Sequence, residues 1–168
     1  VGDDAKTQMT LNTLINAATA RIDGYYGDLG RALVSQTWRQ DFGYFACKNR
    51  LPLEPVLSIT SVTYYDSTNA QQTLSTSVYQ MLTDALGSYI ALKPDQDWPT
   101  TYDRPDAVSV LFSAGYGAAS DVPADIKLAA LHMVSHWNEH REAAGPNMST
   151  VPLTAEELLF PYRRNLYV

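Results

Sequence analysis

The chain has 168 residues, with 12 Lys and Arg against 18 Asp and Glu, and its formal net charge is −6. This acidic balance excludes a protein that coats nucleic acid through a basic surface. The only cysteine is Cys47, which excludes a disulfide framework and a cysteine-based zinc ribbon. Because 45% of the residues are hydrophobic and 18% are charged, the composition favours a folded domain with an ordinary core.

Neither a signal peptide nor a membrane span is expected in these residues. The first residues, VGDDAK, have no basic region and no apolar run of the kind that a signal peptide needs. The longest strongly apolar stretch without charge covers about residues 107–120, and it is too short and too rich in Gly and Ser to cross a bilayer. We therefore expect no membrane partner.

Helical spacing of apolar residues predicts a first helix over residues 10–26. The apolar positions that share its face are Leu11, Leu14, Ile15, Ala18, Ile22 and Tyr25. Asp3 and Asp4 lie ahead of it, where carboxylates favour a helix N-terminus, and Gly27 marks its end. Residues 1–31 are therefore predicted to be an N-terminal helical part.

Residues 32–117 are predicted to be rich in β-strand. The segment 58–65, SITSVTYY, is dense in β-branched and aromatic residues, which suit a pleated surface. Turn residues follow it at 66–69, and a proline-rich, acidic segment at 94–106 is expected to be an exposed loop. The other predicted strands lie in residues 33–42, where Val34, Trp38 and Phe42 share one face, and at 78–82, 88–92 and 107–114.

The C-terminal part returns to helix over residues 118–160. A long helix is predicted at 122–143, about 33 Å in length, with Ile126, Ala130, Met133 and Trp137 along one stripe. A short helix follows, in which Thr154 and Glu157 form a capping box. Pro161 ends it and leaves residues 161–168 as an extended arm. The fold class is therefore α+β, in one domain over 1–168 with a β-rich insertion between helical parts.

The long helix carries the sharpest catalytic motif in the chain. His132, His136 and His140 share one face, and His136-x-x-Glu139-His140 matches the inverted zinc-protease motif. In a zinc hydrolase, His136 and His140 would bind the ion and Glu139 would activate its water. No third ligand is evident downstream, and so short a pattern arises often by chance. A polar face at an interface explains the motif better, and we expect no metal and no cofactor.

Other catalytic templates are weaker still. The sequence has no nucleophile elbow and no phosphate-binding loop, and its acidic loop lacks the pattern of a calcium site. Tyr64 and Tyr65 point to opposite faces of a strand, so they supply no aromatic platform for a carbohydrate-binding module. The 11 tyrosines favour a protein that works through interfaces rather than an enzyme.

An ordered set of segments, spread over most of the chain, carries a family resemblance. These segments are Gly30-Arg31-Ala32-Leu33-Val34, Gln36-Thr37-Trp38-Arg39, Pro52-Leu53, Pro55-Val56, Ser58-Ile59-Thr60-Ser61-Val62, Trp98-Pro99, Arg104-Pro105-Asp106-Ala107-Val108, Ala114-Gly115-Tyr116-Gly117, Val122-Pro123, Ile126-Lys127, His136-Trp137, Arg141-Glu142, Leu158-Leu159 and Pro161-Tyr162-Arg163. In this order they resemble the head–tail connector, or adaptor, proteins of long-tailed bacteriophages, prophages and related gene-transfer particles. The sequence departs from the family in having His140 where Asn is usual and fewer residues before the first helix.

The resemblance implies a structural virion protein. Such proteins form a ring, usually twelve-fold, beneath the portal protein, extend the DNA channel, and attach a neck stopper or tail protein. Double-stranded DNA would be passing cargo, and the protein would reside in the host cytoplasm before it enters the neck of the virion. The family's C-terminal arm docks into the portal, which here implies Pro161, Tyr162, Arg163, Arg164, Leu166 and Tyr167. The polar face of the long helix, with His136, Glu139, His140 and Arg141, is a candidate contact between subunits.

Two other functions remain open at this point. A neck stopper or tail-completion protein would occupy a neighbouring position in the same particle, but the helical ends and the Pro-Tyr-Arg arm favour the adaptor. A zinc hydrolase that uses the His136 motif is a remote alternative, which tight stoichiometric zinc would support.

Overall fold

The computed structural model of the protein describes residues 2–139 and 153–164. These residues belong to two compact units. A helical unit combines Val1–Arg31 with Ser120–Arg164, and a β unit is formed by Ala32–Ala119. The mixed α and β content agrees with the predicted fold class, whereas the prediction of one domain over 1–168 stays a prediction.

Three helices build the helical unit: α1 (Gly2–Ile22), α2 (Ala124–Glu139) and α3 (Leu153–Leu159). The first helix begins eight residues earlier than predicted and therefore includes Asp3 and Asp4. It ends at Ile22 because Gly24 follows with a positive φ of 84°, which an L residue adopts only at a cost. The predicted long helix is confirmed from Ala124 to Glu139, and its predicted end lies outside the described residues.

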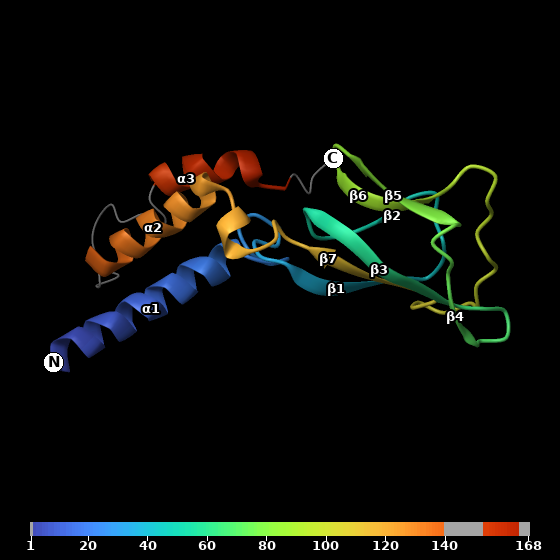
Figure 1. The fold of residues 1–168 in the computed structure, drawn as a ribbon, viewed down its shortest axis with the longest axis horizontal. Coiled ribbons are helices and arrows are strands. Elements are labelled where there is room, and N and C mark those ends of the chain that lie inside the picture. The colour runs from blue at the N-terminus through green and yellow to red at the C-terminus, as the bar shows by residue number, and fades with distance from the viewer. Residues whose placement is uncertain (1, 140–152, 165–168) are drawn as a thin grey trace. The chain divides into compact units, whose positions relative to one another are not determined.

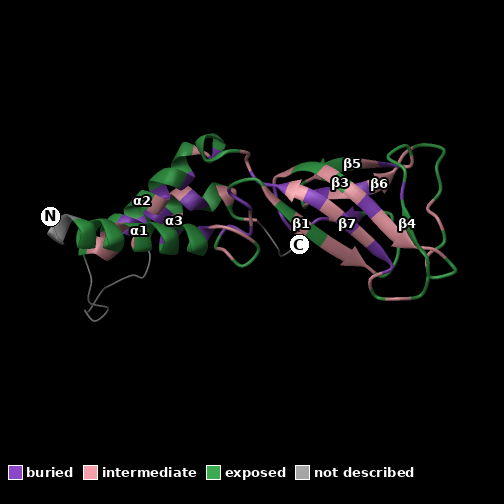
Figure 2. Ribbon diagram, turned by 60° about the horizontal axis from the view of Figure 1, so that its bottom comes forward, coloured by how far each residue is buried: buried purple, intermediate pink, exposed green. Residues whose placement is uncertain are grey.

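The core of the helical unit lies where α1 and α3 both pack against α2. Small and branched side chains allow this close approach, and the buried positions are Ala18, Ile22, Ile126, Ala129, Met133, Ala155 and Leu159. Most of α1 before Ala18 is exposed, as the green turns of α1 show (Figure 2). Among the described residues, no helix is long and apolar enough to cross a membrane.

Two antiparallel sheets build the β unit (Figure 1). The four-stranded sheet has the order β1-β7-β3-β4, in which β1 is Gln36–Phe42, β3 is Val56–Tyr65, β4 is Gln71–Thr73 and β7 is Val108–Ala114. The three-stranded sheet has the order β2-β6-β5, in which β2 is Asn49–Arg50, β5 is Tyr79–Asp84 and β6 is Gly87–Leu92. All five predicted strands are present. The sequence did not predict β2 and β4, because two or three residues are too few to show an alternating pattern.

The burial pattern of the central strand β7 shows which face of the four-stranded sheet forms the core. Its residues alternate between buried and half-buried, which appears as purple bands along the ribbon (Figure 2). Phe112 is fully buried and lies opposite Trp38 of β1 and Ile59 of β3. One face of the four-stranded sheet therefore supplies the core, while the other face carries polar residues.

The segment 94–106, predicted to be an exposed loop, is attached to this core. Trp98 is half-buried and stacks on Phe45, with ring centroids 4.5 Å apart and planes 5° apart. Phe45 also contacts the ring of Tyr64, which packs against the core. The loop is therefore fixed at Trp98 rather than exposed throughout.

A buried carboxylate connects the two sheets. Glu54, just before β3, is only 8% exposed. Its carboxylate accepts hydrogen bonds from the backbone N–H of Ser88 and, at 3.1 Å, from the Ser88 hydroxyl, both on β6. It also accepts a bond from the N–H of Val56, at 3.3 Å. These bonds compensate for the desolvation of the carboxylate and fix β6 beside the start of β3.

Gly115 provides a test of the close backbone packing after β7. Its φ is +128°, and a Cβ at this position would collide with the backbone of Val34 and Ser35. We expect Gly115→Ala to lower the free energy of unfolding by at least about 2 kcal/mol, because strain and collision add. Gly43→Ala, in the same unit, is the matched control, since its Cβ would have nearest neighbours at 3.6 Å. Urea unfolding should show little change for Gly43→Ala, and equal effects of the two variants would contradict this account.

The turn after β3 predicts a measurable pH dependence. The Thr68 hydroxyl donates to Asp66 Oδ1 at 2.6 Å, and together with bonds from Gln72 and Ala70 it lowers the pKa of Asp66 to about 2. Since the ordinary value is about 3.9, Asp66 stabilises the fold fully above pH ~4, and this contribution is lost as the pH falls through about 2. Titration of the carboxyl carbon by NMR should show a higher pKa in Thr68→Val, whereas Thr73→Val should leave it unchanged.

Candidate interaction surfaces

The start of the predicted docking arm is attached to the helical unit. Nε of Arg31 donates to the carbonyl oxygen of Tyr162 at 2.6 Å, and the Tyr162 hydroxyl donates to Asp125 at 3.1 Å. The N–H of Arg164 donates to the carbonyl of Leu29, also at 3.1 Å. The start of the arm, as far as Arg164, is therefore held on this unit. Nothing in the sequence pattern indicated the contact with Arg31, which lies 131 residues from Tyr162.

The other predicted docking residues are distributed on both sides of this attachment. Pro161 is exposed within a short 3-10 helix, Phe160–Tyr162, and Arg163 is exposed in extended backbone. Leu166 and Tyr167 lie outside the described residues. The docking role of these residues stays a prediction.

The predicted polar face of α2 is only partly described. His136 is half-buried, and exposed Glu139 accepts a hydrogen bond from the Ser135 hydroxyl at 3.3 Å. His140 and Arg141 lie outside the described residues. Within the part of the chain that the structure describes, no three potential metal ligands come together, so the zinc motif gains no support from geometry.

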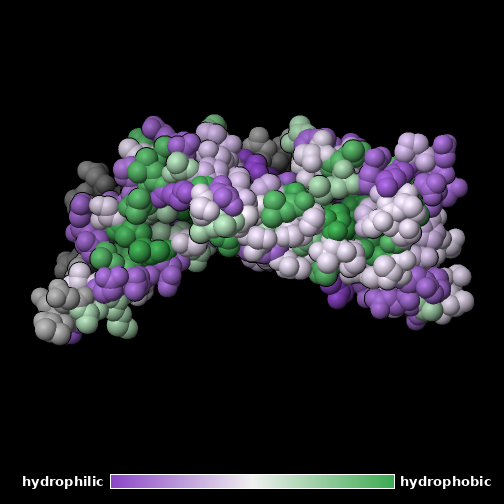
Figure 3. Space-filling view, viewed as in Figure 1, coloured by the Kyte–Doolittle hydropathy of each residue, from purple (hydrophilic) through white to green (hydrophobic). Residues whose placement is uncertain are grey.

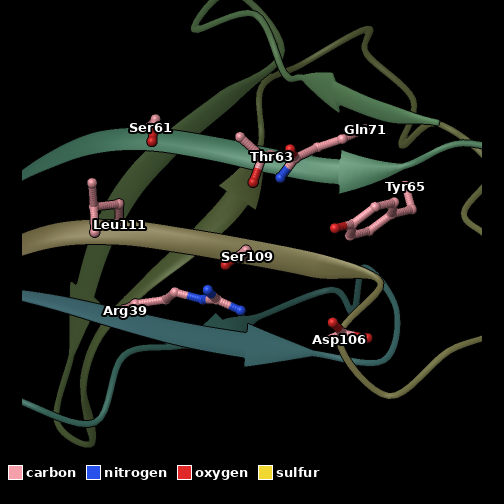
Figure 4. A pocket seen from close by; sticks show the side chains of 8 residues that line it. All are labelled: Arg39, Ser61, Thr63, Tyr65, Gln71, Asp106, Ser109 and Leu111. Carbon is pink, nitrogen blue, oxygen red and sulfur yellow. The ribbon is translucent and has the colours of Figure 1, made fainter.

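A polar hollow of about 210 Å³ lies on the outer face of the four-stranded sheet (Figure 4). Residues from all four strands and from the loop before β7 line it, namely Arg39, Ser61, Thr63, Tyr65, Gln71, Asp106, Ser109 and Leu111. Their register explains the arrangement, because Arg39, Leu111 and Ser61 lie in one row across three strands. Successive side chains of a strand point alternately to this face and to the buried face, so the side chains that line the hollow point to solvent.

The charges around this polar hollow are paired locally. Arg39 binds Asp41 through two hydrogen bonds of 2.8 and 2.9 Å, and this contact lowers the pKa of Asp41. Arg104 binds Asp106 in the same way, at 2.6 and 2.7 Å, and lowers the pKa of Asp106. The Arg104 guanidinium also lies 3.8 Å from the centre of the Tyr65 ring. Such paired charges suit a contact surface that is polar and close to neutral.

A second cluster of charges lies beside exposed Cys47. Arg50 donates to both oxygens of Asp84 at 2.8 Å, and Lys48 donates to one of them at 2.9 Å. Arg50 and then Lys48 hold the pKa of Asp84 well below its usual range. Both cations are therefore engaged with Asp84.

An apolar groove of about 310 Å³ lies between two helices of the helical unit. Its lining is Ile15, Ala18 and Thr19 from α1 with Lys127, Ala130, Leu131 and Val134 from α2. Hydrophobic surface is visible over these two helices (Figure 3). The sequence pattern predicted a polar contact face on α2 and not this groove, since the groove residues come from helices more than 100 positions apart in the chain.

Known proteins that resemble this chain were found by comparing structures. No protein-family model matches the sequence, and no curated protein matches it either. A chain from the neck of the native GTA particle, computed with C12 symmetry, matches with a TM-score of 0.66 at 21% identity and covers 95% of this chain and 82% of that chain. The fold is that of a gene transfer agent neck chain. This match confirms, at the level of the fold, the resemblance to connector proteins of gene-transfer particles.

Two further structures agree with this match. A chain from the virion of the native gene transfer agent particle matches with a TM-score of 0.67 at 20% identity, covering 98% of this chain and 80% of that chain. A chain from the neck of the empty GTA particle, computed with C6 symmetry, matches with a TM-score of 0.68 at 19% identity, covering 99% and 80%. The likeness therefore extends over both units of the neck-like fold.

The attachment of the arm can be tested through Arg31. We expect Arg31→Ala to weaken the attachment by about 1–2 kcal/mol, because it removes a charge-assisted hydrogen bond to Tyr162. Hydrogen exchange at the Arg164 amide, which is bonded to Leu29, should then be roughly tenfold faster. Arg21→Ala, which removes an exposed pair with Asp28, is the control and should leave that amide unchanged. Equal exchange rates in both variants would argue against the attachment.

Proposed function

We propose that this protein is a structural component of a virion neck, namely a head–tail adaptor. Copies of the chain form a ring, of about twelve subunits, beneath the portal protein. The ring lengthens the DNA channel and offers a surface to a neck stopper or tail protein. The protein acts in the virion after a stage in the host cytoplasm, and this role needs no catalysis, cofactor or metal.

The observation that carries this proposal is the match to a neck chain over 95% of the present chain. Helices and sheets both take part in that match, because a partial fit to one unit would cover far less. The C12 and C6 symmetries of those necks are properties of repeated rings of chains. A ring of the present chain is the simplest assembly that uses the same fold in the same way.

The net charge of the chain supports a channel through which DNA passes without binding. The net charge of −6 gives the chain no overall attraction for phosphate, so DNA would pass through a ring rather than adhere to it. The pairing of Arg39 and Arg104 with carboxylates points the same way, because neither guanidinium is left to bind a phosphate.

The contacts at the start of the arm narrow the set of residues that we assign to docking. Tyr162 and Arg164 attach the start of the arm to the helical unit, so we assign docking on the portal to residues 165–168. Removing residues from Pro161 onward would also remove the Tyr162–Asp125 contact and would damage the unit itself. Truncation after Arg164 is therefore the cleaner test of docking.

The test is to mix purified chain with intact rings of the portal protein encoded beside it and to image the product by electron microscopy with rotational averaging. We expect the full chain to add a ring of matching symmetry and the chain ending at Arg164 to add none. Tyr26→Ala, which truncates a side chain that is 98% exposed, is the control and should still add a ring. Equal melting temperatures would show that the shortened chain is folded.

Each outcome separates one part of the proposal from another. If the shortened chain also adds a ring, the adaptor role stands and the docking role of residues 165–168 falls. If no version binds portal but the full chain binds a preformed portal–adaptor complex, the protein is a stopper or tail-completion protein. If neither occurs, the neck proposal fails.

A further inference from the structure

The geometry points to a specific contact between neighbouring copies: Phe160 of one copy inserts into the apolar groove between α1 and α2 of the next. This inference rests on the proposed ring and names the surfaces that close it. A ring needs two different patches on each chain, since a heterologous contact joins unlike faces. The helical unit carries two such patches.

The apolar groove is the first patch. Leu131 is 61% exposed and Ile15 is 46% exposed, although both line a hollow whose other walls are almost entirely apolar. Large apolar side chains that border a hollow are typical of a surface that is covered in an assembly. Lys127 supplies the only charge among the lining residues, and it donates to the carbonyl of Ser120 at 3.0 Å. Its ammonium has two further donors for a partner.

The second patch is the outer stripe of α3, continued into the 3-10 helix. Leu153 and Phe160 are 69% and 74% exposed, while Ala155 and Leu159 face the core of the unit. Glu157 is exposed between them. The groove is lined by α1 and α2 alone, so this stripe is a separate surface of the same unit.

The two patches match in spacing. Lys127, Leu131 and Val134 follow one another at steps of four and three residues along α2. Leu153, Glu157 and Phe160 repeat those steps, so each stripe is about 10 Å long. A helix that lays apolar side chains at this spacing into a groove is a common mode of recognition.

The patches also match in chemistry. The groove of about 310 Å³ has room for one aromatic ring, and buried aromatic side chains are the usual anchors of interfaces. Glu157 lies about one helical turn before Phe160. When Phe160 enters the groove of the next copy, the Glu157 carboxylate comes within reach of that copy's Lys127. The contact therefore joins a buried ring with an ion pair of opposite charges.

This contact is distinct from the polar face that the sequence suggested. His136 follows Lys127 by nine positions, which is about two and a half helical turns, so the two residues lie on opposite sides of α2. One experiment can therefore separate the groove from the His136 face.

The test is disulfide cross-linking of full-length chains on portal rings. Cys47→Ser removes the native thiol, and Leu131→Cys and Phe160→Cys are placed on separate chains that are mixed before assembly. We expect a Leu131→Cys to Phe160→Cys dimer on a non-reducing gel, and a ladder when one chain carries both cysteines. His136→Cys replaces Leu131→Cys in the control, because it lies five positions further along, about 140° round α2, and this pair should not cross-link.

The outcomes distinguish this inference from the proposed ring. A ring by microscopy with the Leu131–Phe160 cross-link supports both. A ring that cross-links only through His136→Cys, or in neither pair, overturns the groove contact and leaves the adaptor role intact. The absence of any ring overturns the adaptor role and the groove contact with it.

Substitutions give an independent measure. Phe160→Ala should weaken ring assembly roughly 30-fold, while Tyr26→Ala, which truncates another exposed aromatic of the unit, should change it less than twofold. Lys127→Glu and Glu157→Lys should each weaken assembly, and the double variant should recover it. Failure of the double variant to recover, together with a neutral Phe160→Ala, would overturn the contact.

Discussion

The helical unit depends on a contact between the two segments of the chain that build it. Arg31 is the last residue before the chain enters the β unit, and it binds the carbonyl of Tyr162 after the chain has returned. The bond from Arg164 to Leu29 closes the same junction. Together with the bond from Tyr162 to Asp125 of α2, these contacts hold the start of the arm against both segments of the unit.

The β unit, in contrast, is a continuous insertion with its own core. Strand β7 pairs with β1 on one side and β3 on the other, and Glu54 connects the two sheets through Ser88. Because this unit closes on itself, its outer polar face can change without disturbing the helices. The two units therefore carry different surfaces: the helical unit holds the start of the arm and the groove, and the β unit presents a paired-charge surface.

Local pattern predicted the helices and the longer strands, because period and propensity act within a few residues. The alternation in β7 and the stripe of Ile126 and Met133 on α2 are direct cases. Local pattern did not predict the Arg31–Tyr162 contact, the two-residue strand β2, or the groove beside Leu131. These features arise from residues that are distant in the sequence, and only tertiary packing brings them together.

The discontinuity of the helical unit has a consequence for synthesis. A ribosome releases α1 first, then the whole β unit, and only later α2 and α3. The β unit can therefore complete its core during translation, while α1 waits with its apolar face uncovered. Because the groove has walls from both α1 and α2, a chain that stops before α2 lacks it entirely. A polypeptide that ends before Phe160 lacks the exposed stripe of α3 as well, so only a chain that extends past Phe160 carries both apolar surfaces.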